Sequence, residues 1–324
     1  MRVSAGRGGA PELGQPLSNL TQLMSSTDLE TASAPSLRHV PRRYIALGLI
    51  IVAIVLLGTL VLVRDNFSPT SSPTTESFNP APSSLVSTLA SVPATVYDAV
   101  GVSSPTAPVT PLRPTTGSGN APLWTATANG RPAKPVVFFY GAEFAPYAAA
   151  QRWPLILALS RFGTFHQLGL MQSSPTTAFS NLSTFTFYDS SYTSKYVTLE
   201  SVERYSSLNP TGARYLSLQV PTTRQSAAVA DYGQSANSFP LLDVANHYVL
   251  QGASFTPDVL VGLSQDQIAG DLSSPLSPLT QAVVSAANEI SASICAVDGQ
   301  NPTNVCLSRG VEAADDALNI VPAA

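Results

Sequence analysis

The chain has 324 residues and a formal net charge of −4, a length that allows one or two domains. Charged residues make up only 11% of it, and the few Lys and Arg are scattered, so no nucleic-acid-binding surface is expected. The low charge, the 27 prolines and the many Ser and Thr residues favour an extracytoplasmic protein.

The first predicted element is a transmembrane helix over residues 44–63, which carry no charged side chain. An apolar run of about 20 residues matches the bilayer core as a helix. The alternative, a signal peptide, fits less well because no small-residue cleavage site follows the run. We therefore expect the lipid bilayer to be a partner of the chain through these residues.

Basic residues define the expected orientation of this helix. Arg38, Arg42 and Arg43 precede it, whereas Arg64 on the far side is countered by Asp65. The positive-inside rule then predicts a single-pass protein of the cell membrane with a cytoplasmic N-terminus and an extracytoplasmic C-terminal domain. Residues 1–43 are rich in Ser, Gly and Pro and are predicted to be a disordered cytoplasmic tail.

Pro, Ser and Thr dominate the next stretch, residues 64–84, which we predict to be a semi-extended tether. Apolar residues then recur at near-helical spacing from Leu85 to Val100, with a break at Pro93. We interpret residues 85–122 as a docking helix followed by a linker.

The predicted folded domain covers residues 123–310, and residues 311–324 form a C-terminal tail. Expected strands are 123–128, 134–141, 183–189 and 195–205, and a pair of strands around Asn246. Expected helices are 146–162, ending at Gly163 and kinked at Pro154, one that begins at Thr256–Pro257, and a last helix over 277–295. Strands and helices in this order around one core predict an α/β domain.

The most informative stretch is "GAEFAPYAAAQRW", residues 141–153, which joins a predicted strand to a predicted helix. It resembles the corresponding region of a thioredoxin-like family, the domain-of-unknown-function family 929, which typically has Cys-Pro-aromatic-Cys there. The likeness extends roughly from Leu85 to Cys306. This chain has Ala145-Pro146-Tyr147-Ala148 instead, and the sequence leaves open whether the alanines are natural or engineered.

The resemblance implies a fold class, α/β with a thioredoxin-like domain in which a central mixed sheet is flanked by helices, in addition to the N-terminal transmembrane helix. It also implies that the Phe239–Pro240 peptide bond is cis. Because Ala145 and Ala148 carry no thiol, dithiol exchange at this position is excluded. What remains is a groove for an extended peptide, with Phe144, Tyr147, Trp153, Phe239 and Pro240 as the predicted binding residues.

Two cysteines, Cys295 and Cys306, are the only sulfhydryl groups of the chain. An even pair in an extracytoplasmic domain predicts a structural disulfide. The alternative is a displaced catalytic pair, which would need a thiolate stabilised by a nearby cation, and no basic residue lies close in sequence before Arg309.

Other chemistry is not indicated. His39, His166 and His247 lack metal-ligand spacing, and no phosphate-binding or dinucleotide motif is present, so no metal and no cofactor are expected. Glu143 has two interpretations, an acid with a raised pKa beside an apolar strand, or a helix-entry carboxylate that interacts with the helix dipole.

The leading functional hypothesis is a membrane-anchored module that binds an extended peptide or a membrane redox partner and has no catalytic residue. One alternative is a member of a thiol–disulfide oxidoreductase family, with active relatives or as an engineered Cys-to-Ala variant. A second alternative is a structural envelope protein that uses the fold as a spacer.

Overall fold

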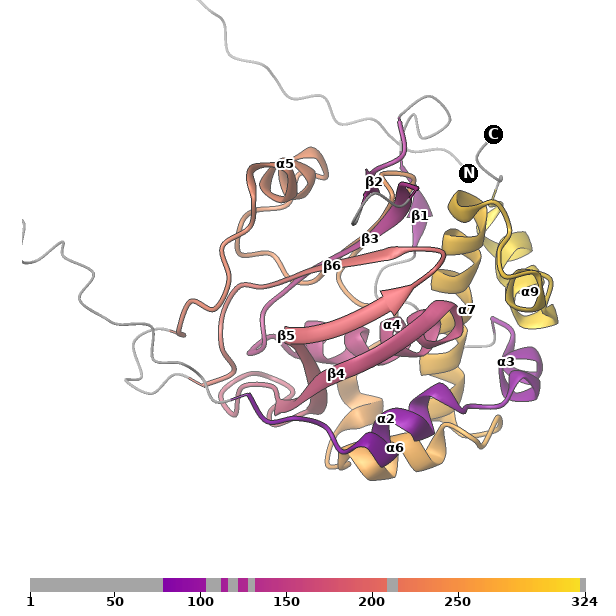
Figure 1. The fold of residues 1–324 in the computed structure, drawn as a ribbon. Helices are drawn as coiled ribbons and strands as arrows, with labels where there is room; N and C mark the ends of the chain where they lie inside the picture. The colour runs from indigo at the N-terminus through magenta and orange to yellow at the C-terminus, as the bar shows by residue number, and fades with distance from the viewer. Residues whose placement is uncertain (1–77, 103–111, 116–121, 128–131, 209–214, 321–324) are drawn as a thin grey trace, which may run out of the picture. The chain divides into compact units, whose positions relative to one another are not determined.

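The computed structural model describes residues 78–102, 112–115, 122–127, 132–208 and 215–320, which all belong to one structural unit, Ser71–Ala324 (Figure 1). The helices are α2 (Ser83–Ala90), α3 (Ala94–Val100), α4 (Pro146–Phe162), α5 (Thr223–Asp231), α6 (Gln265–Asp271), α7 (Pro278–Asp298), α8 (Thr303–Cys306) and α9 (Arg309–Leu318), with a 3-10 turn η1 (Pro257–Leu260). The strands are β1 (Arg113–Pro114), β2 (Thr125–Ala126), β3 (Lys134–Gly141), β4 (Gly163–Gln172), β5 (Ser183–Ser194), β6 (Thr198–Glu203), β7 (Leu241–Val244) and β8 (Tyr248–Gln251).

Strand β3 is the centre of a six-stranded mixed sheet. It pairs in parallel with β6 and antiparallel with β7, and β7 pairs antiparallel with β8. Helix α4 follows β3 directly, so it belongs to the crossover that the parallel pairing of β3 and β6 requires. All residues of β3 after Lys134 are buried, as expected for a strand covered on both faces.

The two faces of this sheet carry two apolar clusters. Val137 and Phe139 of β3 point into the larger cluster with α4 and α7, whereas Val136, Phe138 and Tyr140 point into a smaller cluster with α5. This alternation follows the two-residue period of a strand. Helix α5 accordingly lies on the opposite side of the sheet from α4 and α7 (Figure 1).

Strands β4 and β5 form a separate two-stranded sheet. The outer edge of β4 is extended by the segment Phe78–Ala81, where the Ala81 N–H donates to the Leu168 carbonyl (2.8 Å) and the Leu170 N–H donates to the Asn79 carbonyl (2.7 Å). Residues directly before α2 therefore form part of the folded unit.

Helix α4 ends at Phe162, before Gly163, as the sequence predicts. The reason for glycine is a close approach rather than a left-handed turn. Gly163 is extended, and a Cβ atom there would collide with the Thr193 carbonyl oxygen and the Tyr192 ring on β5. The chain consequently passes from helix α4 straight into strand β4.

Several local predictions are confirmed: the helical break at Pro93, strand β3, helix α4, the strands β7 and β8 around Asn246, and helix α7. The helix expected from Thr256 is instead η1 followed by α6, which begins at its own cap, Ser264. Strand β4 and helix α5 are not among the predicted elements. Helix α9 occupies most of the stretch assigned to a C-terminal tail.

The predicted fold class, a thioredoxin-like domain with one N-terminal transmembrane helix, is wrong. The described residues form a mixed α/β fold with two sheets rather than one, because the chain between α4 and β6 folds back on itself as β4 and β5. Among the described helices, none combines the length and the apolar character needed to cross a membrane. The span predicted over residues 44–63, with its contact to the bilayer, lies outside the described residues.

Candidate binding site at the start of helix α4

The segment Ala145-Pro146-Tyr147-Ala148 lies at the start of α4, shortly after the end of β3. Ala145 is the N-cap of the helix, has extended backbone dihedrals and offers no side chain to cap the first N–H groups, and Pro146 occupies the first turn. Ala148 is fully buried and Ala145 is 7% exposed, whereas Pro146 and Tyr147 are half-buried. The two alanine methyl groups therefore pack into the core, and the surface at this point is formed by their neighbours.

Aromatic side chains from four separate parts of the chain gather beside this corner. We define the aromatic cluster as Tyr140, Phe144, Tyr205, Tyr215 and Phe239. The Phe144 ring stacks on the Tyr215 ring (centroids 4.2 Å apart) and meets the Phe239 ring edge-on at 5.9 Å. The Phe239 ring in turn lies 5.4 Å from Tyr140 and 6.1 Å from Tyr205. Four of the five rings are half-buried, so the cluster presents apolar area to solvent.

The Phe239–Pro240 peptide bond is cis, as predicted. Pro240 is buried, and its carbonyl oxygen accepts a hydrogen bond from the Gly252 N–H (2.8 Å). Within the described part of the chain, no hydrogen bond engages the backbone N–H or C=O of Phe239. This pair of backbone groups lies directly before strand β7, next to the aromatic cluster.

Of the other two predicted binding residues, one lies near the site and one does not. Tyr147 lies near the site, with its ring edge-on to Phe179 at 6.1 Å. Trp153 is completely buried: its indole N–H donates to the Ser183 carbonyl (3.1 Å), and its ring packs against Phe185 at 4.9 Å. Trp153 therefore belongs to the core between α4 and β5 and does not face the site.

Glu143 is buried in the loop before α4, and its N–H donates to the Tyr205 carbonyl (2.8 Å). That bond ties the loop to the residues following β6. It brings Phe144 and Tyr205, which are far apart in sequence, into the same cluster.

A buried ion pair lies beneath the site, between α4 and β6. The Arg152 Nε and Nη2 donate to the two carboxylate oxygens of Glu203 at 2.9 and 2.6 Å, and both side chains are fully buried. This pair is not among the residues predicted from the sequence. A signal was present, because Arg152 lies in a largely apolar stretch of helix, where an ionised side chain needs a partner.

Cys295 at the end of α7 and Cys306 in α8 form the predicted disulfide, with Cα atoms 5.5 Å apart. No free cysteine exists among the residues that the structure describes, and these two are the only cysteines of the sequence. The alternative of a displaced catalytic pair is disfavoured by burial, because both cysteines are buried, whereas a catalytic pair needs a sulfur atom that a substrate can reach.

The histidines of the chain do not lie together in the described residues. His166 is exposed and pairs with the Thr193 hydroxyl (2.8 Å), His247 lies in the turn between β7 and β8, and His39 is outside the described residues. The described residues contain no cluster of three or more potential metal ligands. Burial raises the pKa of Asp243 on β7 to about 7, although the Asn246 N–H donates to its carboxylate.

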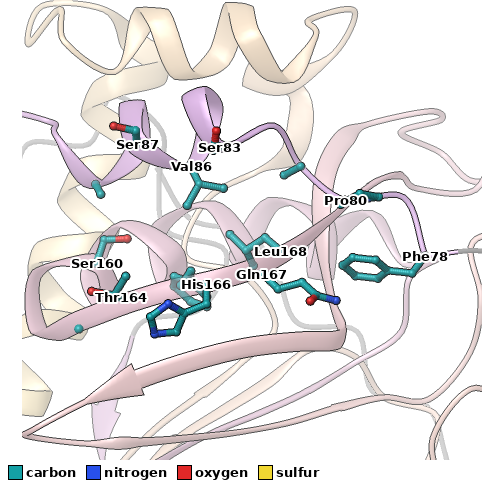
Figure 2. A pocket seen from close by; sticks show the side chains of 14 residues that line it. Phe78, Pro80, Ser83, Val86, Ser87, Ser160, Thr164, His166, Gln167 and Leu168 are labelled. Atoms are coloured by element: carbon teal, nitrogen blue, oxygen red, sulfur yellow. The ribbon is translucent and has the colours of Figure 1, made fainter.

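A cavity of about 570 Å³ lies on another face, between α2 and β4 (Figure 2). Val86 on α2 and Leu168 on β4 point toward each other across it, Phe78 closes one end, and Ser160 and Thr164 lie at the other. Its described lining contains no carboxylate, ammonium or guanidinium group but includes the imidazole of His166. None of these lining residues belongs to the aromatic cluster.

Comparison with known proteins gives one match. A family model described as "Domain of unknown function (DUF929)" matches residues 127–296, the stretch from just after β2 to near the end of α7. No curated protein and no solved structure shows a significant match.

Proposed function

The chain belongs to the DUF929 family, and we propose that its folded domain binds an extended peptide segment, from an unfolded chain or a partner protein, at the aromatic cluster beside Phe239. The observation that carries the proposal is the backbone N–H and C=O of Phe239 directly before β7, which no residue in the described part of the chain engages in a hydrogen bond. An extended peptide can satisfy both groups by adding a short strand, which is a common mode of peptide recognition.

The aromatic cluster supplies the second part of the binding energy. Its half-buried rings offer apolar area against which side chains of the peptide can pack. Main-chain hydrogen bonds then give affinity, and the rings select apolar side chains at alternate positions of the peptide. None of these contacts needs sulfur, so the function is compatible with Ala145 and Ala148.

A thiol–disulfide oxidoreductase is the alternative from a different class, and this chain offers it no support. Dithiol exchange requires a thiolate nucleophile. Positions 145 and 148 carry methyl groups, and both cysteines of the chain are buried, out of reach of a substrate disulfide. Any such activity in the family belongs to members that have cysteines at these positions.

We also infer that the domain works outside the cytoplasm. The Cys295–Cys306 disulfide supports this inference, because disulfides persist in oxidising compartments and are rare in the cytosol.

The test is binding of the purified full-length protein to an array of unstructured synthetic peptides of diverse sequence. We expect retention of peptides rich in alternating apolar residues, and weaker retention by Tyr215→Ala and Phe144→Leu. Leu276→Ser is the matched control, because Leu276 is 86% exposed in the turn before α7. Equal retention by all three variants, or no retention by the wild-type protein, would refute the proposal. Circular dichroism spectra and melting temperatures confirm that the variants are folded.

A further inference from the structure

A second cavity, of about 330 Å³, lies on the α5 side of the sheet, where β3 and β6 end. Its walls combine aliphatic groups of Val220 and Val229 with the polar groups of Tyr140, Arg204, Ser226 and Gln234. Among the described residues that line the cavity, Arg204 is the only ionised side chain and none is a carboxylate. The electrostatic character of the cavity is therefore that of one guanidinium group.

The Arg204 guanidinium has unused hydrogen-bonding capacity. Its Nη1 donates to the Gln219 carbonyl (2.6 Å), and its plane lies over the Tyr205 ring at 5.2 Å. The Arg204 side chain also hydrogen-bonds to the Tyr140 hydroxyl. The Arg204 Nε is buried, so a ligand in the cavity meets the Nη groups, and in the described part of the chain no acidic residue pairs with the guanidinium. Arginine does not deprotonate in proteins, so this cation stays charged without a counterion.

Arg152 shows what the same group does in this protein when a carboxylate is present. Its Nε and Nη2 hold both oxygens of Glu203. A buried N–H without a partner costs free energy that a hydrogen bond recovers, and the guanidinium edge matches a carboxylate in geometry. The Nε of Arg204 is left without the partner that the corresponding atom of Arg152 has.

We propose that the Arg204 cavity binds a carboxylate group of the peptide held at the aromatic cluster, an inference that rests on the proposed function. Two contacts connect the sites: Tyr140 lines the cavity and packs 5.4 Å from Phe239, and Tyr205 lies between Arg204 and Phe239. A strand paired with Phe239 therefore passes within reach of the cavity. The carboxylate comes from an acidic side chain or from the C-terminus of the peptide.

General attraction for anions does not account for such a preference, because the whole chain is net negative at −4. The selection is local, through a charge-assisted contact inside a partly enclosed cavity. A peptide that lacks the carboxylate leaves the Arg204 guanidinium without a counterion, which is the penalty that makes the preference measurable.

The first experiment follows the arginine Nε–H signals of the full-length protein by NMR during titration with propionate, and with propionamide at matched ionic strength. The Arg204 signal is assigned by its absence in Arg204→Lys. We expect a saturable shift of this signal with propionate alone, while the signal of Arg113, an exposed arginine, stays in place. Equal shifts at both arginines, or none at Arg204, would overturn the carboxylate site.

The second experiment compares peptides selected on the array in matched pairs, with Glu against Gln and with a free against an amidated C-terminus. We expect the carboxylate member of one pair to bind about 10-fold more tightly to the wild-type protein and equally to Arg204→Gln. The pair that shows the difference identifies the source of the carboxylate. Peptide binding without any such preference overturns this inference and leaves the proposed function intact. A propionate shift without binding of any peptide overturns the proposed function and leaves the carboxylate site.

Discussion

Neutralising one half of the Arg152–Glu203 pair should destabilise the domain strongly. In Glu203→Gln the cation of Arg152 stays fully buried and loses its carboxylate partner. Its Nη1 has no hydrogen-bond partner among the described residues even in the wild-type protein, so no second acceptor compensates for the loss. Breaking a buried pair on one side costs about 3–5 kcal/mol. Since a domain is typically stable by about 5–15 kcal/mol, this single amide could remove a large part of the free energy of unfolding.

Removing both charges together should cost much less. The double variant Arg152→Met with Glu203→Leu replaces the pair by apolar side chains of similar volume, a change that is often close to neutral. The remaining cost comes from the Phe187 N–H, which donates to the Glu203 carboxylate (3.3 Å) and loses its acceptor. The double variant is therefore expected to be more stable than the single variant Glu203→Gln.

Urea unfolding at neutral pH gives the free energies of unfolding of the wild-type protein, Glu203→Gln and the double variant. The unfolding is followed by tryptophan fluorescence and circular dichroism. Arg113→Met is the matched control, because Arg113 is exposed and binds only the Gln251 side chain (2.8 Å), so its loss should change stability by less than about 0.5 kcal/mol. A single variant that loses less than about 1 kcal/mol, or a double variant as unstable as the single one, would refute the reasoning.

Three further changes test other parts of the fold. Replacing Cys295 and Cys306 by alanine opens a link across a sequence separation of 11 and should lower the free energy of unfolding by about 3 kcal/mol, measured without reductant; an unchanged urea midpoint would contradict this. Burial raises the pKa of Asp243 to about 7, above its unfolded value near about 4, so the native state holds a proton that the unfolded state releases. Stability should therefore fall as the pH rises from about 4 to about 7 and then level off, and Asp243→Asn should reduce that fall in urea titrations across this range. Gly310→Ala places a Cβ against the backbone of α3 and should cost about 1–3 kcal/mol in melting experiments, whereas Gly270→Ala, with open space around the added Cβ, should not.

The correctly predicted elements are those that local signals define. Pro93 cannot continue a helix, and the chain starts α3 directly after it. The continuous run of apolar and aromatic residues in β3 predicts a buried strand, whichever strands pair with it. Pro146 sets the first turn of α4. These features depend on neighbours in sequence, so a single chain reveals them.

The missed elements depend on partners that are distant in sequence. Strand β4 has an irregular pairing with β5, with shifts of register around Gln167, so it lacks the clean alternation of a regular strand. The capping box of Thr222 and Gln225 marks the start of helix α5, but the helix is only weakly apolar, so apolar periodicity does not reveal it. The two-sheet arrangement is decided by how β4 and β5 fold back, which no local pattern specifies.

The candidate site shows the same division between local signals and distant partners. Phe144, Tyr147 and Phe239 are identified by their place next to the motif and the proline. Tyr205 and Tyr215 join them only because the chain after β6 returns to the start of α4, where the Glu143 N–H and the Tyr205 carbonyl hold the two segments together. The surface is thus held by backbone bonds and by core packing, to which the methyl groups of Ala145 and Ala148 contribute. No thiol is part of this framework, so the proposed binding at the aromatic cluster does not require cysteine at either position.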